Sequence, residues 1–236
     1  MPSKHKADMS TLTNVDIRPY HAENKSAGRT SAAKESVSII PKAISSQTGV
    51  SVEYAQDPSK KWYVVRASYG RERRAYDYMV EDGTFTYLPR HTVYKLRNDR
   101  RVRTEEVLVP NILFVYATRE KADEYVQDTA QLDFLTYYYD HFHTENGKNP
   151  PLVVPNSEMH NFVLVTSTDS EHVRLVNAEQ CRFKSGDTVR VVGGPFCGVE
   201  GRVARVSGQQ RVIVTINGLC SVATAYIPSA FLETIE

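Results

Sequence analysis

The chain has 236 residues, of which 41% are hydrophobic and 24% are charged, and this composition suits one or two globular domains. Its formal net charge is only +1, so it lacks the overall excess of Lys and Arg from which nonspecific nucleic-acid binders draw their affinity. No run approaches the roughly 18 apolar residues of a membrane-spanning helix, and the first residues lack the apolar region of a secretory signal. We therefore expect a cytoplasmic protein without membrane contact.

Residues 1–60 are rich in Ser, Lys, Ala and Thr and contain neither Phe nor Trp. This composition, without sustained periodicity, predicts a disordered N-terminal extension. A short apolar run at residues 37–40 leaves open that part of the extension pairs as a strand.

Regular structure is predicted from residue 61 onward. Residues 62–67 have the composition of a strand, and residues 70–83 show helical spacing that closes with Gly83 as the C-cap. A second strand in "TFTYLP" and a third in "VLVPNILFVYA" flank the polar segment "RHTVYKLRNDRRVRTEE", which predicts a long hairpin.

The following segments complete this domain. "REKADEYVQDTAQ" predicts a helix, "LDFLTYY" a strand, and "PNSEMHNFVLV" a last helix whose N-cap is Asn156 or Ser157. The order β, α, β, β, α, β, α predicts an α+β domain over residues 61–166, with helices packed on a sheet.

The remaining chain predicts a linker and a small β-domain. Residues 167–182 are polar and weakly patterned, as in a linker. Five short β-runs follow within residues 183–236, and five short strands with turn signals predict a small barrel. The glycine-rich "GGPFCG" forms a turn between two strands and leaves the Phe196 ring at its tip, where an apolar side chain is a candidate for partner contact.

The segments "KKWYVVRASYGRE", "VLVPNILFVY" and "FKSGDTVRVVGGPFCGVEG" together resemble the NusG family of transcription elongation factors. The resemblance covers residues 61–236 and implies an N-terminal NusG-like α/β sandwich that binds RNA polymerase, followed by a KOW domain folded as an SH3-like β-barrel. "PNILF" resembles specialised paralogues such as RfaH. "VVPNSEMHNFVLV" is similar to the UpxY branch, which acts on capsular polysaccharide operons.

The resemblance also implies binding sites. In the family, apolar residues on the strand after the "PN" turn and on the last helix of the first domain form a depression for the clamp helices of RNA polymerase. The matching residues here are Ile112, Phe114, Met159 and Phe162. The alternative, that these four are core residues, stays open, because strand alternation puts Ile112 and Phe114 on one face in both cases. Phe196 would contact a partner of the KOW domain, such as a ribosomal protein or a termination factor.

The polar hairpin carries a second candidate site, which the family places near the nontemplate DNA strand or nascent RNA at the transcription bubble. Its basic residues form a local electropositive finger, which the start of the first helix extends. The candidate nucleic-acid contacts are Arg71, Arg73, Arg74, Arg90, Lys95, Arg97, Arg100, Arg101 and Arg103. A solvated charge run, or arginine stems that cover a sheet edge, remains the alternative.

An enzyme is not favoured. His141 and His143, with Asp140 nearby, suggest a metal site, but no third and fourth ligand has suitable spacing. The three cysteines lack C-x-x-C spacing, and "GGPFCG" lacks the Lys-Ser/Thr ending of a phosphate-binding loop.

We expect a non-enzymatic, monomeric antitermination or processivity factor for a long operon, such as one for capsular or surface polysaccharide synthesis, without cofactor or metal. A ribosome- or RNA-associated KOW protein is the alternative, and a metal enzyme is a distant third.

Overall fold

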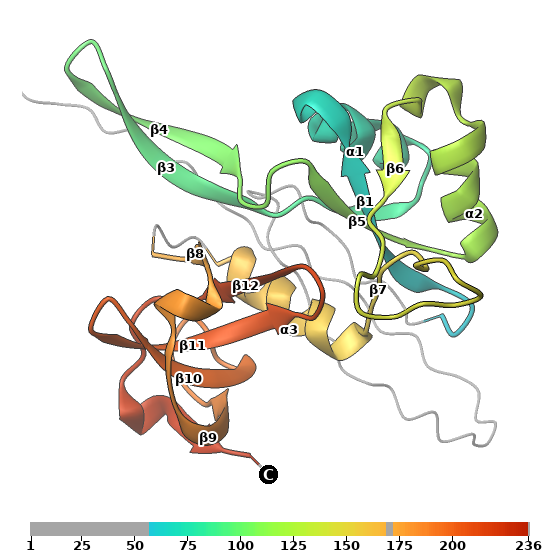
Figure 1. Cartoon of the computed structure of the whole chain (residues 1–236). Helices are drawn as coiled ribbons and strands as arrows, with labels where there is room; N and C mark the ends of the chain where they lie inside the picture. The colour runs from blue at the N-terminus through green and yellow to red at the C-terminus, as the bar shows by residue number, and fades with distance from the viewer. Residues whose placement is uncertain (1–56, 169–171, 236) are drawn as a thin grey trace, which may run out of the picture. The chain divides into compact units, whose positions relative to one another are not determined.

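The computed structural model describes residues 57–168 and 172–235 (Figure 1). The predicted disordered extension falls almost wholly outside these residues. The described chain forms two larger antiparallel sheets and a separate two-stranded hairpin. None of its described helices is long and apolar enough to span a membrane.

The first sheet is built around one central strand. β1 (Lys61–Ala67) pairs on one side with β5 (Ile112–Ala117), and β5 pairs in turn with β2 (Phe85–Tyr87). On its other side, β6 (Leu135–Tyr137) pairs with one end of β1 and β7 (Val153–Val154) with the other end. The sheet order is therefore β2-β5-β1-β6, with β7 beside β1, and the three predicted strands at its centre are confirmed.

Strand alternation divides this sheet into two buried faces. Val65 and Leu113 belong to a cluster with Ala75 and Met79 of α1 (Glu72–Glu81), so α1 packs on this face. Val64 and Phe114, which are cross-strand neighbours, belong to a second cluster on the opposite face. Because both faces are covered, β5 is buried at every position.

The two helical segments on the first face end differently from each other. α1 has Asp82 at its C-cap, so the predicted Gly83 C-cap is off by one residue, and Gly83 follows at φ +77°, a conformation that favours glycine. α2 (Arg119–Asp123) continues as a π-helical turn, η2 (Glu124–Asp128), which ends where Thr129 donates its backbone N–H to the Glu124 carbonyl. The helix predicted to extend through residue 131 is therefore shorter.

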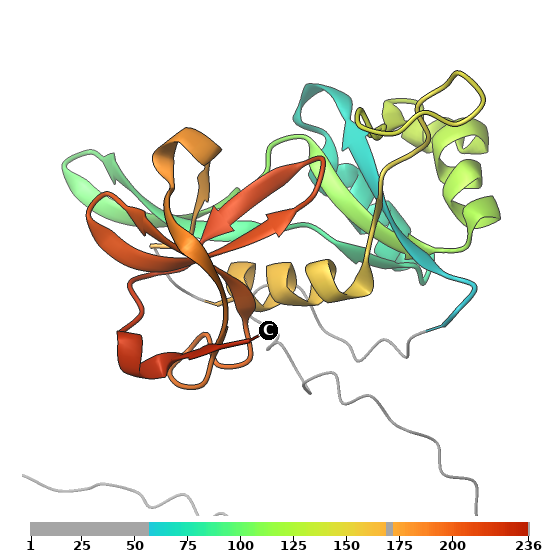
Figure 2. The ribbon, with the colours of Figure 1, turned by 60° about the horizontal axis from the view of Figure 1, so that its bottom comes forward.

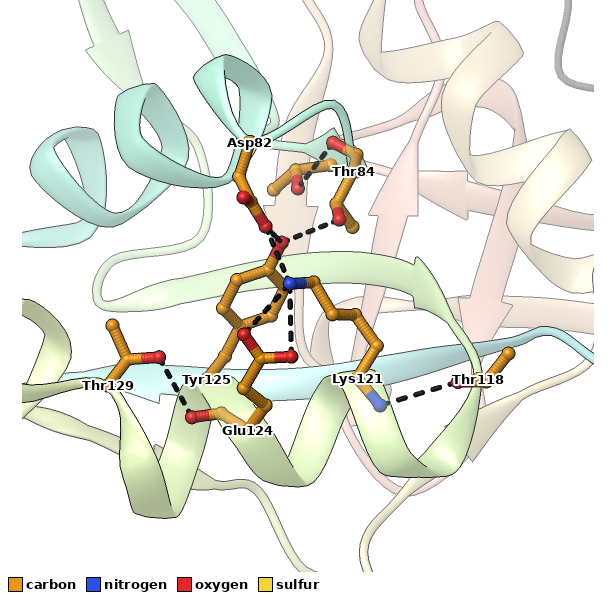
Figure 3. A network of polar contacts seen from close by, with 8 residues as sticks. Asp82, Thr84, Thr118, Lys121, Glu124, Tyr125 and Thr129 are labelled. Atoms are coloured by element: carbon orange, nitrogen blue, oxygen red, sulfur yellow. Dashed lines mark hydrogen bonds and ion pairs between the residues drawn. The ribbon is translucent and has the colours of Figure 1, made fainter.

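A polar network joins the end of α1 to α2 and η2 (Figure 3). The Tyr125 hydroxyl lies 2.5 Å from the Asp82 carboxylate and 2.6 Å from the Thr84 hydroxyl. Lys121 Nζ reaches Asp82 at 2.7 Å and Glu124 at 3.0 Å. These contacts hold the two helical segments together over the sheet.

The third helix covers the opposite face. α3 (Asn156–Thr166) has Pro155 at its N-cap position, without a side-chain cap hydrogen bond. Asn156 is therefore the first residue of the helix and not its N-cap. The predicted N-cap is therefore wrong. The Phe162 ring lies 5.4 Å from that of Phe114, which places α3 against β5.

The second sheet has six antiparallel strands in the order β13-β9-β10-β11-β12-β8. These strands are β8 (Arg174–Val176), β9 (Arg182–Val191), β10 (Glu200–Val206), β11 (Gln209–Ile216), β12 (Cys220–Ala223) and β13 (Leu232–Thr234). Among the described residues no pairing joins β8 to β13, so a closed barrel is not formed. β8 pairs with β12. Part of the range predicted as a linker, residues 167–182, therefore belongs to the second sheet.

The sheet requires glycine at one position. A Cβ on Gly201 of β10 would lie 2.4 Å from the Ile213 carbonyl oxygen of β11, so no side chain fits there.

Four short 3-10 turns complete the described chain: η1 (Ser68–Gly70), η3 (Ala130–Leu132), η4 (Ala178–Gln180) and η5 (Ser229–Phe231).

The predicted long hairpin is confirmed, and it consists of strands rather than of loop. β3 (Arg90–Arg97) pairs with β4 (Arg100–Val107) along their whole length, and the hairpin projects from the first sheet (Figure 1). Asn98 and Asp99 form its two-residue turn with φ of +50° and +58°. Asn and Asp tolerate this left-handed conformation, which matches the twist of the strands.

Candidate functional site

The four residues expected to bind polymerase lie together, and all are buried. Ile112, Phe114, Met159 and Phe162 belong to one apolar cluster, and the last three have no exposed surface. The same cluster includes residues of the second sheet, among them Val212 of β11. The apolar face of the first sheet, α3 and the second sheet therefore share one continuous core.

One side of α3 packs on the first sheet. The Phe162 ring meets Phe114 and, edge to face at 6.4 Å, Tyr87. The Tyr87 and Thr166 hydroxyls are hydrogen-bonded at 2.5 Å. Burial raises the pKa of the Tyr87 phenol well above its usual range, since the phenolate would lose its hydration.

Another side of α3 contacts the second sheet and its loops (Figure 2). Glu158 accepts two hydrogen bonds from Asn217, and Asn161 Oδ1 accepts the backbone N–H of Glu200 at 2.8 Å. A Cβ built on Gly198 would lie 4.0 Å from Leu164, which places Leu164 against the glycine-rich turn. Residues 158, 161 and 164 share one side of the helix because they are three apart.

The exposed position expected for Phe196 is wrong. Its side chain is 4% exposed and joins the same apolar cluster. The turn is tight, since the Gly198 N–H bonds to the Val191 carbonyl at 2.8 Å and the Val199 N–H to the Phe196 carbonyl at 3.1 Å. This fold directs the ring inward.

An apolar patch that the sequence patterns did not predict lies beside this turn. Phe231 is 41% exposed and Val192 is also exposed. A Cβ on Gly193 would lie 3.0 Å from the Phe231 ring, so this ring packs over the glycine. The signal in the sequence was the pair of adjacent glycines, which leaves room for a ring from elsewhere.

Several of the basic candidates have structural contacts. Arg73 Nη2 donates to the Glu105 carbonyl oxygen at 3.1 Å, and Arg90 pairs with the Glu105 carboxylate at 3.3 Å. Both contacts fix the base of the hairpin, since Arg73 comes from α1 and Arg90 also lies over the Tyr76 ring of that helix.

At the start of α1, two more basic candidates flank one ring. Arg71 lies 4.0 Å and Arg74 5.6 Å from the centre of Phe134. Arg71 also donates from Nε to the Ser68 carbonyl at 3.2 Å. The guanidinium groups of these residues therefore cover an aromatic side chain.

The remaining basic residues occupy the exposed outer half of the hairpin. Lys95 forms an ion pair with Glu106, and this lysine holds the pKa of the Glu106 carboxyl below its usual range. Arg97 and Arg100 face each other across the turn, and Arg101 lies 4.4 Å from the centre of the Tyr94 ring. In this outer half of the hairpin, the positive charge of Arg101 therefore lies beside the aromatic ring of Tyr94.

His141 and His143, which suggested a metal site, lie in the segment between β6 and β7. His143 Nδ1 contacts Asp140 at 2.6 Å, while the His141 ring meets Tyr138 at 5.8 Å. Within residues 57–168 and 172–235, no group of three or more His, Cys, Asp or Glu side chains is arranged to hold a metal ion.

The match to a known family covers the first sheet, its helices and the hairpin. Residues 60–163 carry a NusG-family domain. The matching family model is described as "Transcription termination factor nusG". This NusG domain includes Ile112, Phe114, Met159 and Phe162 and all the basic candidates.

Among solved structures, the chain is similar to one titled "Domain interaction in Thermotoga maritima NusG". The identity is 21% and the TM-score is 0.37, over 75% of this chain and 98% of that chain. A search of curated proteins found no match.

Proposed function

We propose that this protein is a transcription elongation and antitermination factor that binds RNA polymerase. The observation that carries the proposal is the NusG domain at residues 60–163, because proteins of this family bind the polymerase. It spans the sheet, α1, α2, the hairpin and α3 up to residue 163, so the four residues of the proposed binding surface lie within it.

The polymerase-binding surface in this proposal is the apolar side of the first sheet and α3, around Ile112, Phe114, Met159 and Phe162. These residues share a core with the second sheet. Binding of the clamp helices then requires that the second sheet separate from α3, which breaks the interactions of Glu158, Asn161 and Leu164. The clamp helices would replace one apolar neighbour of α3 with another.

Two substitutions in the full chain test this binding surface. Leu164→Asp places a charge on the side of α3 that the second sheet covers and that the clamp helices would then contact, so binding to core RNA polymerase should fall at least tenfold. Glu158→Ala removes only polar contacts to the second sheet, so binding should stay equal or become tighter. Val80→Asp, at an exposed position of α1 on the other face, is the control. Equal binding by all three variants would contradict this surface.

The outer hairpin is proposed to contact nontemplate DNA or nascent RNA at the transcription bubble. The exposed basic residues Lys95, Arg97, Arg100, Arg101 and Arg103 would carry this contact. Arg71, Arg73, Arg74 and Arg90 would support it mainly through the contacts that fix the hairpin and the helix start.

The second sheet is proposed to be a KOW domain with its own partner, such as a ribosomal protein or a termination factor. Phe196 would take part only after leaving its buried position, whereas Val192 and Phe231 are exposed as they stand. Co-sedimentation with ribosomes in the absence of polymerase binding would instead favour a ribosome- or RNA-associated protein.

The proposal extends to a specialised factor for one long operon, such as one for surface polysaccharide synthesis. Its support is the resemblance of "PNSEMHNFVLV" to the UpxY branch and Asn111 in place of the usual glycine. Asn111 has a left-handed φ of +63°, and its side chain accepts the Gly70 N–H, so asparagine meets the requirement of this turn. Transcript profiling after gene deletion tests the idea. Loss of promoter-distal reads in one operon is expected, and a uniform genome-wide fall would contradict it.

A further inference from the structure

A cavity of about 410 Å³ lies where the NusG domain meets the second sheet. α3 contributes Glu158 to its wall, the segment between β6 and β7 contributes Asp140 and Phe142, and the turn after β11 contributes Asn217 and Gly218. This volume falls in the range of sites that bind small molecules. Because both parts of the chain line the cavity, it is complete only while the second sheet covers α3.

The wall of this cavity carries negative charge. It includes the carboxylates of Asp140 and Glu158, and none of its described lining residues is Lys or Arg. Glu158 accepts hydrogen bonds from the side-chain amide and the backbone N–H of Asn217, and both donors are uncharged. A cation that entered the cavity would therefore give Glu158 a charged partner, which the described chain does not supply.

Asp140 supplies the second carboxylate. Its Oδ1 accepts the Phe142 N–H at 2.8 Å, and its Oδ2 contacts His143 Nδ1 at 2.6 Å. The hydrogen bond with His143, together with that from Phe142, lowers the pKa of Asp140, so this carboxyl group is ionised at neutral pH. These bonds fix the carboxylate, and each of its oxygens can still accept another hydrogen bond.

The rest of the wall is largely apolar. Leu152, Val153 and Pro155 line it, and the Phe142 ring is 78% exposed. A Cβ on Gly218 would lie 3.3 Å from Leu152 and 3.8 Å from Phe142, so both side chains lie against the turn of the second sheet. An alkyl chain can pack on such a wall, and an exposed ring attracts an ammonium group over its face.

The acidic side chains of the cavity do not converge on one point. In the part of the chain that the structure describes, Asp140, His143 and Glu158 do not form a group that could hold a metal ion. A ligand whose positive charges are separated by an alkyl chain fits this arrangement better than a single ion, which needs several ligands around it.

We propose that this cavity binds a small aliphatic diamine or polyamine, whose ammonium groups contact Asp140 and Glu158 while its alkyl chain packs on Phe142 and Leu152. A lysine side chain of a protein partner has the same chemistry but offers only one charge to the two carboxylates. The ligand would bind best while the second sheet covers α3, and would therefore oppose polymerase binding. This regulatory consequence rests on the proposed function, whereas binding of the amine does not.

Isothermal titration calorimetry of the full chain with putrescine tests the site directly. Glu158→Gln and Asp140→Asn each remove one carboxylate charge, so each should weaken binding at least tenfold. Phe142→Ala should weaken it about threefold. n-Butylamine, which has one ammonium group, should bind at least tenfold more weakly than putrescine, and magnesium chloride should not compete with it.

Three variants serve as controls. Glu145→Gln removes an exposed carboxylate of the same segment that does not line the cavity, and Phe231→Ala removes an exposed ring elsewhere, so both should bind putrescine like the wild type. Asn217→Ala loses the side-chain contact to Glu158 but keeps the carboxylate, and should bind within about threefold of the wild type. Thermal melting of every variant checks that the fold is retained.

Hydrogen exchange and polymerase binding test the preference for the closed arrangement, in which the second sheet covers α3. Putrescine should slow hydrogen exchange of α3 and of residues 217–219 in the wild type, with no change in Asp140→Asn. Saturating putrescine should also raise the apparent Kd of the wild type for core RNA polymerase. An unchanged exchange rate together with an unchanged Kd would contradict this preference.

Three results would overturn the site itself. These are no binding of putrescine by the wild type, equal effects of Glu158→Gln and either Glu145→Gln or Asn217→Ala, or tighter binding of N-acetyl-lysine methylamide than of putrescine. The last result would assign the cavity to a basic side chain of a protein. A chain that binds putrescine in this cavity but never binds polymerase would contradict the proposed function alone, so the two failures are distinguishable.

Discussion

Asn217 donates two hydrogen bonds to Glu158, from its side-chain amide to Oε1 at 2.7 Å and from its backbone N–H to Oε2 at 3.0 Å. Glu158 belongs to the first turn of α3, and Asn217 directly follows β11. One carboxylate therefore links the last helix of the NusG domain to the second sheet.

This link should be measurable as a coupling energy. Glu158→Ala, Asn217→Ala and the double variant form a double-mutant cycle, and we expect a coupling of about 0.5–1 kcal/mol from urea unfolding, since the pair is exposed and charge-assisted. Hydrogen exchange of α3 should rise in each variant. Asn217→Ala keeps the backbone N–H that Glu158 accepts, so additive effects of the two single substitutions would show that the side-chain hydrogen bond contributes nothing to holding the helix.

Gly201 should tolerate no side chain. In Gly201→Ala the new Cβ would lie 2.4 Å from the Ile213 carbonyl oxygen, so β10 and β11 must separate, and we expect a loss of about 2–3 kcal/mol in unfolding free energy. Gly208→Ala is the control, because that position has open space and only an unfavourable φ of +79°. Its cost should be about 1 kcal/mol. Equal costs would contradict the close approach of the strands.

The Tyr125 contacts predict a loss of stability in alkali. Burial, together with the hydrogen bond to Asp82, raises the pKa of Tyr125 to about 12. A raised pKa means that the neutral phenol stabilises the fold below the unfolded pKa of about 10, and that this contribution disappears as the pH rises through about 12. Tyr125→Phe should cost about 1 kcal/mol at pH 7 and reduce the slope of stability between about pH 10 and 12. An unchanged slope would mean that Tyr125 does not carry it.

The same network predicts sensitivity to acid. Hydrogen bonds from Lys121 and Tyr125 lower the pKa of Asp82, so its carboxylate stabilises the fold above the unfolded pKa of about 4, and that contribution is lost as the pH falls below it. Asp82→Asn should lower stability at pH 7 and make stability less dependent on pH below about 4. Asp77→Asn, within the helix that Asp82 caps, is the comparison for simple loss of charge. Identical acid profiles for both variants would contradict the role of the network.

Strand and helix positions followed from periodicity, because alternation and helical spacing are local properties of the sequence. The shared face of Ile112 and Phe114 followed from the same rule, and the structure places both in one cluster. Which surface covers that face was not predictable, since it depends on contacts such as Glu158 with Asn217, which are 59 residues apart.

The roles of the basic residues were also only partly predictable from the sequence. Their number in the hairpin was evident, but their division between two faces depends on the register that the Asn98–Asp99 turn sets. The structural contact of Arg73 with Glu105 was equally hidden, because the two residues are separated by 32 positions. Sequence patterns report local geometry and charge, whereas the roles of single arginines depend on distant partners.

The sequence predicted an exposed Phe196 ring, whereas the structure buries it, and the effect of Phe196 on stability tests which of the two is right. Its ring is 4% exposed in an apolar core, so Phe196→Ala should lower the unfolding free energy by about 3–5 kcal/mol. Phe231→Ala removes a ring of the same size that is 41% exposed, and its cost should stay at about 1 kcal/mol. Urea unfolding of both variants measures the comparison. If Phe196→Ala instead retains wild-type stability and no longer binds a KOW-domain partner, the ring is a contact residue that leaves the core readily, and its burial contributes little to the fold.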